Sequence, residues 1–287
     1  MIQALRCLTA KADRGCVSAG RATYCSRMVA SDKGVAAWTL EAAERWLSHQ
    51  RLQRYLQPAA NDLDLAMRLY QWNASTSAAA MVEVAHLEVA MRNAYTRRLS
   101  ITYPDWLDQS SRLWTRRIGN SARQSDQRRA NELTVTRLEQ AKRGVRHVAT
   151  PDRIIANTTF GLWCHLTDPH REPTLWTPII SGAYPAATKR GAVHRMAMNV
   201  MAFRNRIAHH EPLFTNTTAF SARVREVRLL HALLDSFSAD RMYNNQLGNL
   251  VVGCPVPGLL QWPEPLSRRP SGLLGNSRPK RGNVPRS

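Results

Sequence analysis

The sequence predicts an all-α fold, and two observations support this prediction. From residue 36 onward, apolar residues recur mostly at the three- and four-residue spacing that gives a helix one apolar face. Strand patterns are almost absent, and only Leu250–Val252 has the composition of a short strand. A bundle of packed helices is therefore the expected architecture.

The first half of the patterned region predicts three helices. Residues 37–57 carry a usable apolar stripe, and Asn61 followed by Asp64 resembles the start of a second helix that continues through Trp72. The best helix is expected from about Ser77 to Ser100. Its apolar residues stay near one face, and they are Ala80, Val84, Leu87, Met91, Ala94 and Leu99.

The second half continues the helical pattern. Residues 120–143 predict a highly polar helix, and Thr150-Pro151-Asp152 marks the start of the next helix, since proline is tolerated in a first turn. Residues 168–187 contain five prolines or glycines and predict a loop with one short helix. Two more helices are expected at Lys189–His210 and Thr218–Phe237.

The ends of the chain lack this periodicity. Residues 1–33 are expected to form a flexible arm and residues 256–287 a disordered basic tail rich in proline and arginine. Between them, residues 34–255 are expected to form one helical domain.

The chain is strongly basic, with a formal net charge of +19. Residues 265–287 contribute +6 and residues 1–33 contribute +4, which leaves +9 for the rest of the chain. A basic folded part favours polyanions, with nucleic acid as the first candidate and anionic membrane surfaces as the second. An arginine-rich but otherwise ordinary soluble protein is the alternative explanation of this charge.

Other features of the sequence indicate the cellular compartment in which the protein is expected. No run of about 18 apolar residues is present, so a membrane span is not expected. The five cysteines are odd in number and form no CxxC pair, which fits free thiols in a reducing cytoplasm better than disulfides or zinc. We therefore expect a cytoplasmic protein without a metal or another cofactor.

The segment Met201–Phe214, MAFRNRIAHHEPLF, contains the strongest candidate site. On a helix with about 100° per residue, Asn205 lies between Arg204 and His209, and the amide of Asn205 can contact the imidazole of His209 one turn later. A histidine near neutral pH can move protons, and an arginine can stabilise the charge that develops during cleavage of a phosphodiester. Arg204 and His209 are thus candidate catalytic residues, with Asn205 and His210 in supporting roles.

Two further considerations apply to this motif. Acid–base cleavage of RNA ideally uses two proton-transfer groups, and a symmetric dimer that brings two such helices together would supply both. Alternatively, the two histidines and the following Glu211-Pro212 could simply cap the helix and close a salt bridge.

Other residues of chemical interest give weaker indications. His165 and His194 could approach the histidine pair, but no HExxH motif or cysteine spacing supports a metal site. Trp72, Trp114, Trp163 and Trp176 could stack nucleobases, although such positions on apolar helix faces are more often part of the core.

The run RNRIAHHEPLF resembles the signature of the Abi-like (abortive infection) proteins, a branch of the HEPN superfamily. Further stretches resemble the same family in the same order, so that the resemblance covers roughly residues 45–250. These stretches are RLQRYLQPAANDLDLAMRLYQWN, EVAHLEVAMRNAYTRRL, TPDRIIANTTFGLWCHL and LWTPII.

The resemblance implies a HEPN-type helical bundle with additional N-terminal helices. It also implies a metal-independent endoribonuclease toxin that acts as a homodimer in phage defence or in a toxin–antitoxin system. Its arginine–histidine pattern maps onto Arg204, Asn205 and His209, with His210 also within the permitted spacing. The polar positions of the family's first core helix match Glu88, Arg92 and Asn93, which become supporting site residues.

Two functions are therefore expected. The first is an RNA-cleaving enzyme whose Arg/His site lies at a dimer interface and whose activity is controlled by an antitoxin or a phage-derived trigger. The second is a non-catalytic HEPN module that binds RNA or a partner protein and in which the Arg–His pair is structural.

Overall fold

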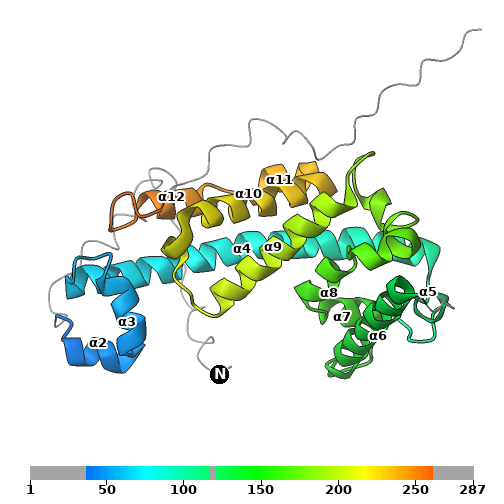
Figure 1. The fold of residues 1–287 in the computed structure, drawn as a ribbon, viewed down its shortest axis with the longest axis horizontal. Helices are drawn as coiled ribbons and strands as arrows, with labels where there is room; N and C mark the ends of the chain where they lie inside the picture. The colour runs from blue at the N-terminus through cyan, green and yellow to red at the C-terminus, as the bar shows by residue number, and fades with distance from the viewer. Residues whose placement is uncertain (1–36, 117–120, 261–287) are drawn as a thin grey trace, which may run out of the picture.

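The computed structural model describes residues 37–116 and 121–260. This part of the chain consists of helices and connecting turns, which confirms the predicted all-α fold (Figure 1). The expected arm and nearly all of the expected tail lie outside the described residues, as do Cys7, Cys16 and Cys25.

Helix α4, Leu63–Thr102, is the centre of the fold (Figure 1). It begins after Asp62, whose side chain accepts a hydrogen bond from the backbone N–H of Leu65 at 2.9 Å. The two helices predicted from Asn61 to Trp72 and from Ser77 to Ser100 are one helix of 40 residues. No glycine or proline lies between them, so nothing in the sequence forces a break.

The apolar stripe predicted over residues 37–57 is divided between two helices, α2 (Leu40–Leu47) and α3 (His49–Leu56). Ser48 separates them with a φ of 66°, a left-handed value that ends one helix before the next begins. Leu47, Leu52 and Leu56 of this stripe are all buried.

Three helices cover two sides of α4 (Figure 1). Helix α9 (Arg190–Ala208) crosses α4, and α10 (Thr217–Leu234) packs against both α4 and α9. Helix α12 (Gln246–Val252) also packs on α4. The strand suggested at Leu250–Val252 was wrong, because Leu247 and Val251 are buried at helical spacing and not in alternation.

The region between α4 and α9 contains α5 (Arg112–Thr115), α6 (Ala122–Arg143), α7 (Pro151–Ala156) and α8 (Phe160–His165). The loop predicted at 168–187 contains three short helical turns where one was expected. These are η1 (Pro169–Arg171), η2 (Glu172–Trp176) and η3 (Ile180–Ala183). Each turn contributes a buried side chain: Arg171 in η1, Leu175 and Trp176 in η2, and Ile180 in η3.

Although α4 has 40 residues, it is not apolar enough to cross a membrane. No other helix in the described part of the chain is both long enough and apolar enough to do so.

The importance of α4 can be tested in its buried face. Leu87 is fully buried, and Leu87→Ala should lower the free energy of unfolding by about 2–5 kcal/mol because it leaves a cavity. Ile101 lies on the same helix but is 76% exposed, so Ile101→Ala should change it by no more than about 0.5 kcal/mol. Urea denaturation of both variants measures the difference, and similar losses would contradict the assigned core.

A buried histidine gives a prediction on pH. His231 of α10 is 3% exposed and its ring nitrogens contact Tyr243 Oη at 2.8 Å and Ser238 Oγ at 2.9 Å. Desolvation lowers the pKa of His231 below its ordinary value. The unfolded chain therefore binds the proton more readily, and stability should fall as the pH drops below about 6.5. Between pH 7 and pH 5, the free energy of unfolding should fall less in His231→Gln than in the wild type, as measured by urea denaturation at each pH. An equal fall in the two proteins would contradict this role of His231.

Candidate functional site

The predicted motif helix ends in a Schellman motif. Helix α9 stops at Ala208, two residues before the predicted end at His210. The N–H of Glu211 donates to the carbonyl of Arg206 at 3.1 Å, and the N–H of His210 donates to the carbonyl of Ile207 at 2.9 Å. His210 occupies the left-handed position of this motif, with a φ of 55°. The backbone itself thus satisfies the last carbonyls of the helix.

Side chains next to this motif fix the direction of the chain that follows. Arg206 Nε donates to Glu211 Oε2 at 2.8 Å, and its NH2 donates to Thr215 Oγ1 at 3.1 Å. The N–H of Leu213, which is buried, donates to Asn73 Oδ1 of α4 at 2.8 Å. Glu211 does form a salt bridge at this helix end, but its partner is Arg206 and not either of the two histidines considered in the structural alternative.

Arg204 and His209 remain at the exposed end of α9. The Arg204 guanidinium donates a hydrogen bond from NH1 to Asn205 Oδ1 at 3.5 Å. Asn205 meets His209 through the backbone, where its carbonyl accepts the N–H of His209 at 2.9 Å. The Asn205 amide therefore faces Arg204, contrary to the expectation that it would orient the imidazole of His209.

The three supporting residues on α4 lie in two different places. Glu88 Oε1 accepts a hydrogen bond from Arg92 NH2 at 2.8 Å, and this pair is largely buried. Asn93 is exposed and lines a groove between α4, α10 and α11 (Ser236–Met242), together with His86 and His231. Fifteen residues separate Glu88 from Asn73, a distance of about 22 Å along the helix. Among the described residues, the hydrogen bonds and ion pairs of Glu88, Arg92 and Asn93 do not join any of them to Arg204 or His209.

The remaining histidine candidates lie near the other end of α9. His165 and His194 are partly buried, and desolvation lowers the pKa of each below its ordinary value. His194 Nδ1 lies 3.0 Å from Thr167 Oγ1. Within residues 37–116 and 121–260, no group of three or more His, Cys, Asp or Glu side chains could hold a metal ion.

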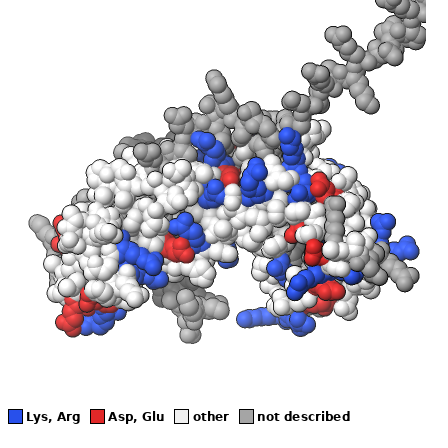
Figure 2. Space-filling model, in the orientation of Figure 1, with Lys and Arg blue, Asp and Glu red and all other residues white. Residues whose placement is uncertain are grey.

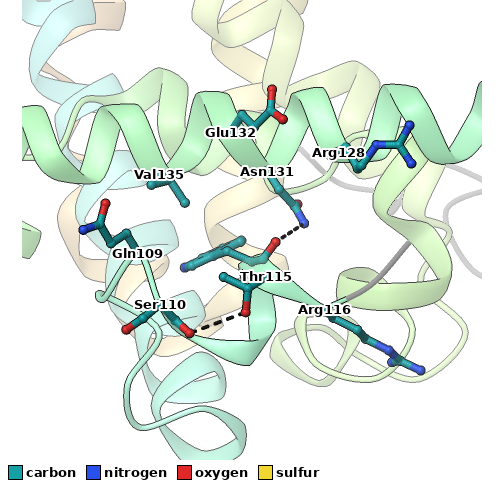
Figure 3. Close-up of a pocket in the computed structure, with 9 residues that line it drawn as sticks. Gln109, Ser110, Thr115, Arg116, Arg128, Asn131, Glu132 and Val135 are labelled. Carbon is teal, nitrogen blue, oxygen red and sulfur yellow. Dashed lines mark hydrogen bonds between the residues drawn. The ribbon is translucent and has the colours of Figure 1, made fainter. Parts of the chain in front are cut away.

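The tryptophans considered for base stacking belong to the core. Their exposed fractions are 7% or less, for Trp72, Trp114, Trp163 and Trp176. A pocket of about 570 Å³ between α5 and α6 is lined in part by Trp114 (Figure 3). Figure 3 shows Arg116 and Arg128 at one end of this pocket and Gln109 and Ser110 at the other. Among the described residues that line it, none is histidine or cysteine, so it lacks a side chain that ordinarily titrates near neutral pH.

Basic side chains are spread over the surface that carries α9 and α10. Figure 2 shows Lys and Arg outnumbering Asp and Glu on this face and gathering over α10, which contains Arg223, Arg225 and Arg228. A surface of this kind attracts polyanions without regard to their sequence.

Comparisons with models of protein families, with curated proteins and with solved structures found no match.

The unusual backbone of His210 provides a test of this helix end. Glycine adopts a positive φ without steric cost, whereas alanine does not. Of two variants that both lack the imidazole, His210→Gly should therefore be more stable than His210→Ala by about 1 kcal/mol. Thermal and urea denaturation measure the difference, and an alanine variant of equal or greater stability would contradict the observed Schellman motif.

Proposed function

We propose that this protein is a metal-independent endoribonuclease in which His209 transfers protons and Arg204 stabilises the transition state. One observation carries the proposal. The end of α9 is held by backbone hydrogen bonds, by the Arg206–Glu211 pair and by Asn73, none of which involves the side chain of Arg204 or His209. A structural role therefore does not account for an exposed guanidinium and an exposed imidazole on one helix end.

The proposed reaction uses the 2′-hydroxyl of RNA as its nucleophile. A general base removes the proton of this hydroxyl, its oxygen attacks phosphorus, and the 5′-oxygen leaves with a proton from a general acid. Arg204 would balance the added negative charge on the phosphoryl oxygens. His209 supplies one of the two proton-transfer groups. The other comes from the exposed His210 of the same chain or from a second copy, as in the dimer expected from the sequence.

The setting of the reaction follows from charge and from the family resemblance. A net charge of +19 would draw RNA to the surface and make its binding sensitive to salt. The resemblance to Abi-like HEPN proteins supports a cytoplasmic toxin of phage defence or of a toxin–antitoxin system. An antitoxin or a phage-derived trigger would then be the natural regulator.

A non-catalytic HEPN module that binds RNA or a partner is the second candidate. The orientation of Asn205 favours it, because this amide accepts from Arg204 and its side chain does not position the imidazole of His209. In this case Arg204 would contact phosphate without any bond being cleaved.

The two proposed functions predict different results when the purified protein is incubated with RNA in the presence of EDTA. The wild type should cleave RNA without metal, and Arg204→Ala and His209→Ala should each lower the rate by about 100-fold or more. Matched controls are Arg51→Ala and His147→Ala, which remove an exposed arginine and an exposed histidine elsewhere and should retain activity.

Loss of activity in all four variants, or in none, would contradict the assigned site. RNA binding by an inactive wild type, weakened in Arg204→Ala, would favour the binding module.

A further inference from the structure

The junction between α10 and α11 (Figure 1) brings a serine and a histidine together. His231 lies in the last turn of α10, and Ser238 lies in the first turn of α11. Asp235 joins the two helices, and its side chain accepts a hydrogen bond from the N–H of Ser238 at 3.1 Å. Because α11 packs against α10, Ser238 Oγ lies 2.9 Å from Nε2 of His231. A hydroxyl and an imidazole thus meet at a place that the proposed ribonuclease site does not use.

Hydrogen-bond distances set the direction of this pair. The single proton of the Ser238 hydroxyl has two acceptors within reach, which are Nε2 of His231 at 2.9 Å and the carbonyl oxygen of Asp235 at 3.4 Å. We assign the proton to the shorter contact, so that Nε2 accepts it. The other ring nitrogen, Nδ1, then carries a proton and donates to Tyr243 Oη at 2.8 Å. A serine that donates to a histidine, which in turn donates to a third group, is the arrangement that activates a nucleophile.

The third group of this arrangement is held by the central helix of the fold. The guanidinium carbon of Arg228 lies 5.3 Å from the centroid of the Tyr243 ring. Arg228 also donates to both carboxylate oxygens of Glu83 on α4, at 2.9 and 2.5 Å. Helix α4 therefore positions Tyr243, and Tyr243 orients the imidazole of His231. Because burial lowers the pKa of His231, the ring is neutral at pH 7 and able to accept a proton.

Ser238 and His231 both line the groove between α4, α10 and α11, which has a volume of about 270 Å³. The two residues differ in their access to solvent, because His231 is 3% exposed whereas Ser238 is partly exposed. The hydroxyl can therefore meet a ligand while the imidazole stays shielded from water. A cavity of this size accommodates a short acyl group but not a large substrate.

The rest of the groove has two kinds of wall. One is apolar and consists of Val89, Ala90, Ala94, Leu234 and Met242. The other carries hydrogen-bond donors, since Asn93 and Arg97 lie one turn apart on the same face of α4. The Asn93 amide and the Arg97 guanidinium are groups of the kind that stabilise a negatively charged oxygen.

We propose that Ser238 and His231 are the nucleophile and the general base of a second active site, which hydrolyses small carboxylic esters. The apolar wall would hold the acyl chain. Asn93 and Arg97 would face the carbonyl oxygen of the ester. This inference goes beyond the proposed ribonuclease and does not depend on it, because neither Arg204 nor His209 lines the groove.

The reaction balances without a metal or a redox partner. Ser238 Oγ attacks the carbonyl carbon of the ester as its proton passes to Nε2 of His231. The resulting oxyanion collapses, the bond to the alkoxy oxygen breaks, and the alcohol leaves with the proton from His231. A water molecule then attacks the acyl group on Ser238 and gives a proton to His231, which returns it to the serine. The products are one carboxylic acid and one alcohol.

Covalent labelling of the full-length protein tests the nucleophile without any substitution. A fluorophosphonate probe reacts with an activated serine, which displaces fluoride and retains the phosphonyl group. Peptide mass spectrometry of the labelled wild type should find one phosphonyl group, on Ser238. His231→Gln should lose the label while circular dichroism shows that it is folded, because glutamine cannot accept the serine proton. A wild type without a label on Ser238, or a folded His231→Gln labelled like the wild type, would overturn the proposal.

Hydrolysis of p-nitrophenyl butyrate at pH 7 tests turnover. Ser238→Ala should lower kcat/KM by about 100-fold or more, because the nucleophile is lost. Ser236→Ala is the matched control, since Ser236 is an exposed serine in the same turn of α11, and it should retain the rate. His147→Ala removes an exposed histidine and measures the background that surface imidazoles contribute. Equal rates in Ser238→Ala and the wild type, including no hydrolysis by either, would contradict an esterase site in this groove.

Discussion

The structure depends on the continuity of α4. In proteins most of the stability of a helix comes from the packing of its apolar positions, and the neighbours of the 40-residue α4 cover those positions. Helices α3, α8, α9, α10 and α12 all pack on it. Because α4 is one rigid element, it holds the chain that follows α9 through Asn73 and the helix α10 through Glu83 at fixed positions along a single axis.

This scaffold separates two kinds of residue at the end of α9. Arg206, Glu211 and the Schellman hydrogen bonds hold the backbone, while Arg204 and His209 point to solvent. Within one short motif, Arg206 and the backbone of His210 therefore hold the helix end, whereas the side chains of Arg204 and His209 are exposed. In the proposed function, a helix end presented by a rigid scaffold would need little reorganisation to meet a phosphodiester.

The helices and the core were largely predictable from the sequence. All six apolar residues predicted for the buried face of the long helix are indeed buried, because periodicity follows directly from helix geometry. The positions of the breaks were less predictable. The break at Ser48 and the continuity of α4 through residues 73–77 depend on packing against segments that are distant in sequence. Local helix propensity contains no information about such packing.

The sequence indicated which residues lie together at the candidate site, but it did not predict their side-chain contacts. Arg204 and His209 are exposed on one helix end, whereas the choice of Arg206 as the partner of Glu211 and of Arg204 as the partner of Asn205 depends on side-chain directions. Asn73 was missed, although a polar residue beside Trp72 on a buried helix face is a signal that could have indicated it.

The ends of the RNA fragments test the central claim most directly. Cleavage by acid–base catalysis through the 2′-hydroxyl should leave 2′,3′-cyclic phosphate and 5′-hydroxyl ends in the presence of EDTA. Mass spectrometry of a short oligoribonucleotide incubated with the wild-type protein identifies them. Fragments with 3′-hydroxyl and 5′-phosphate ends, or an oligoribonucleotide left intact, would contradict the assignment of Arg204 and His209 as a metal-independent catalytic pair.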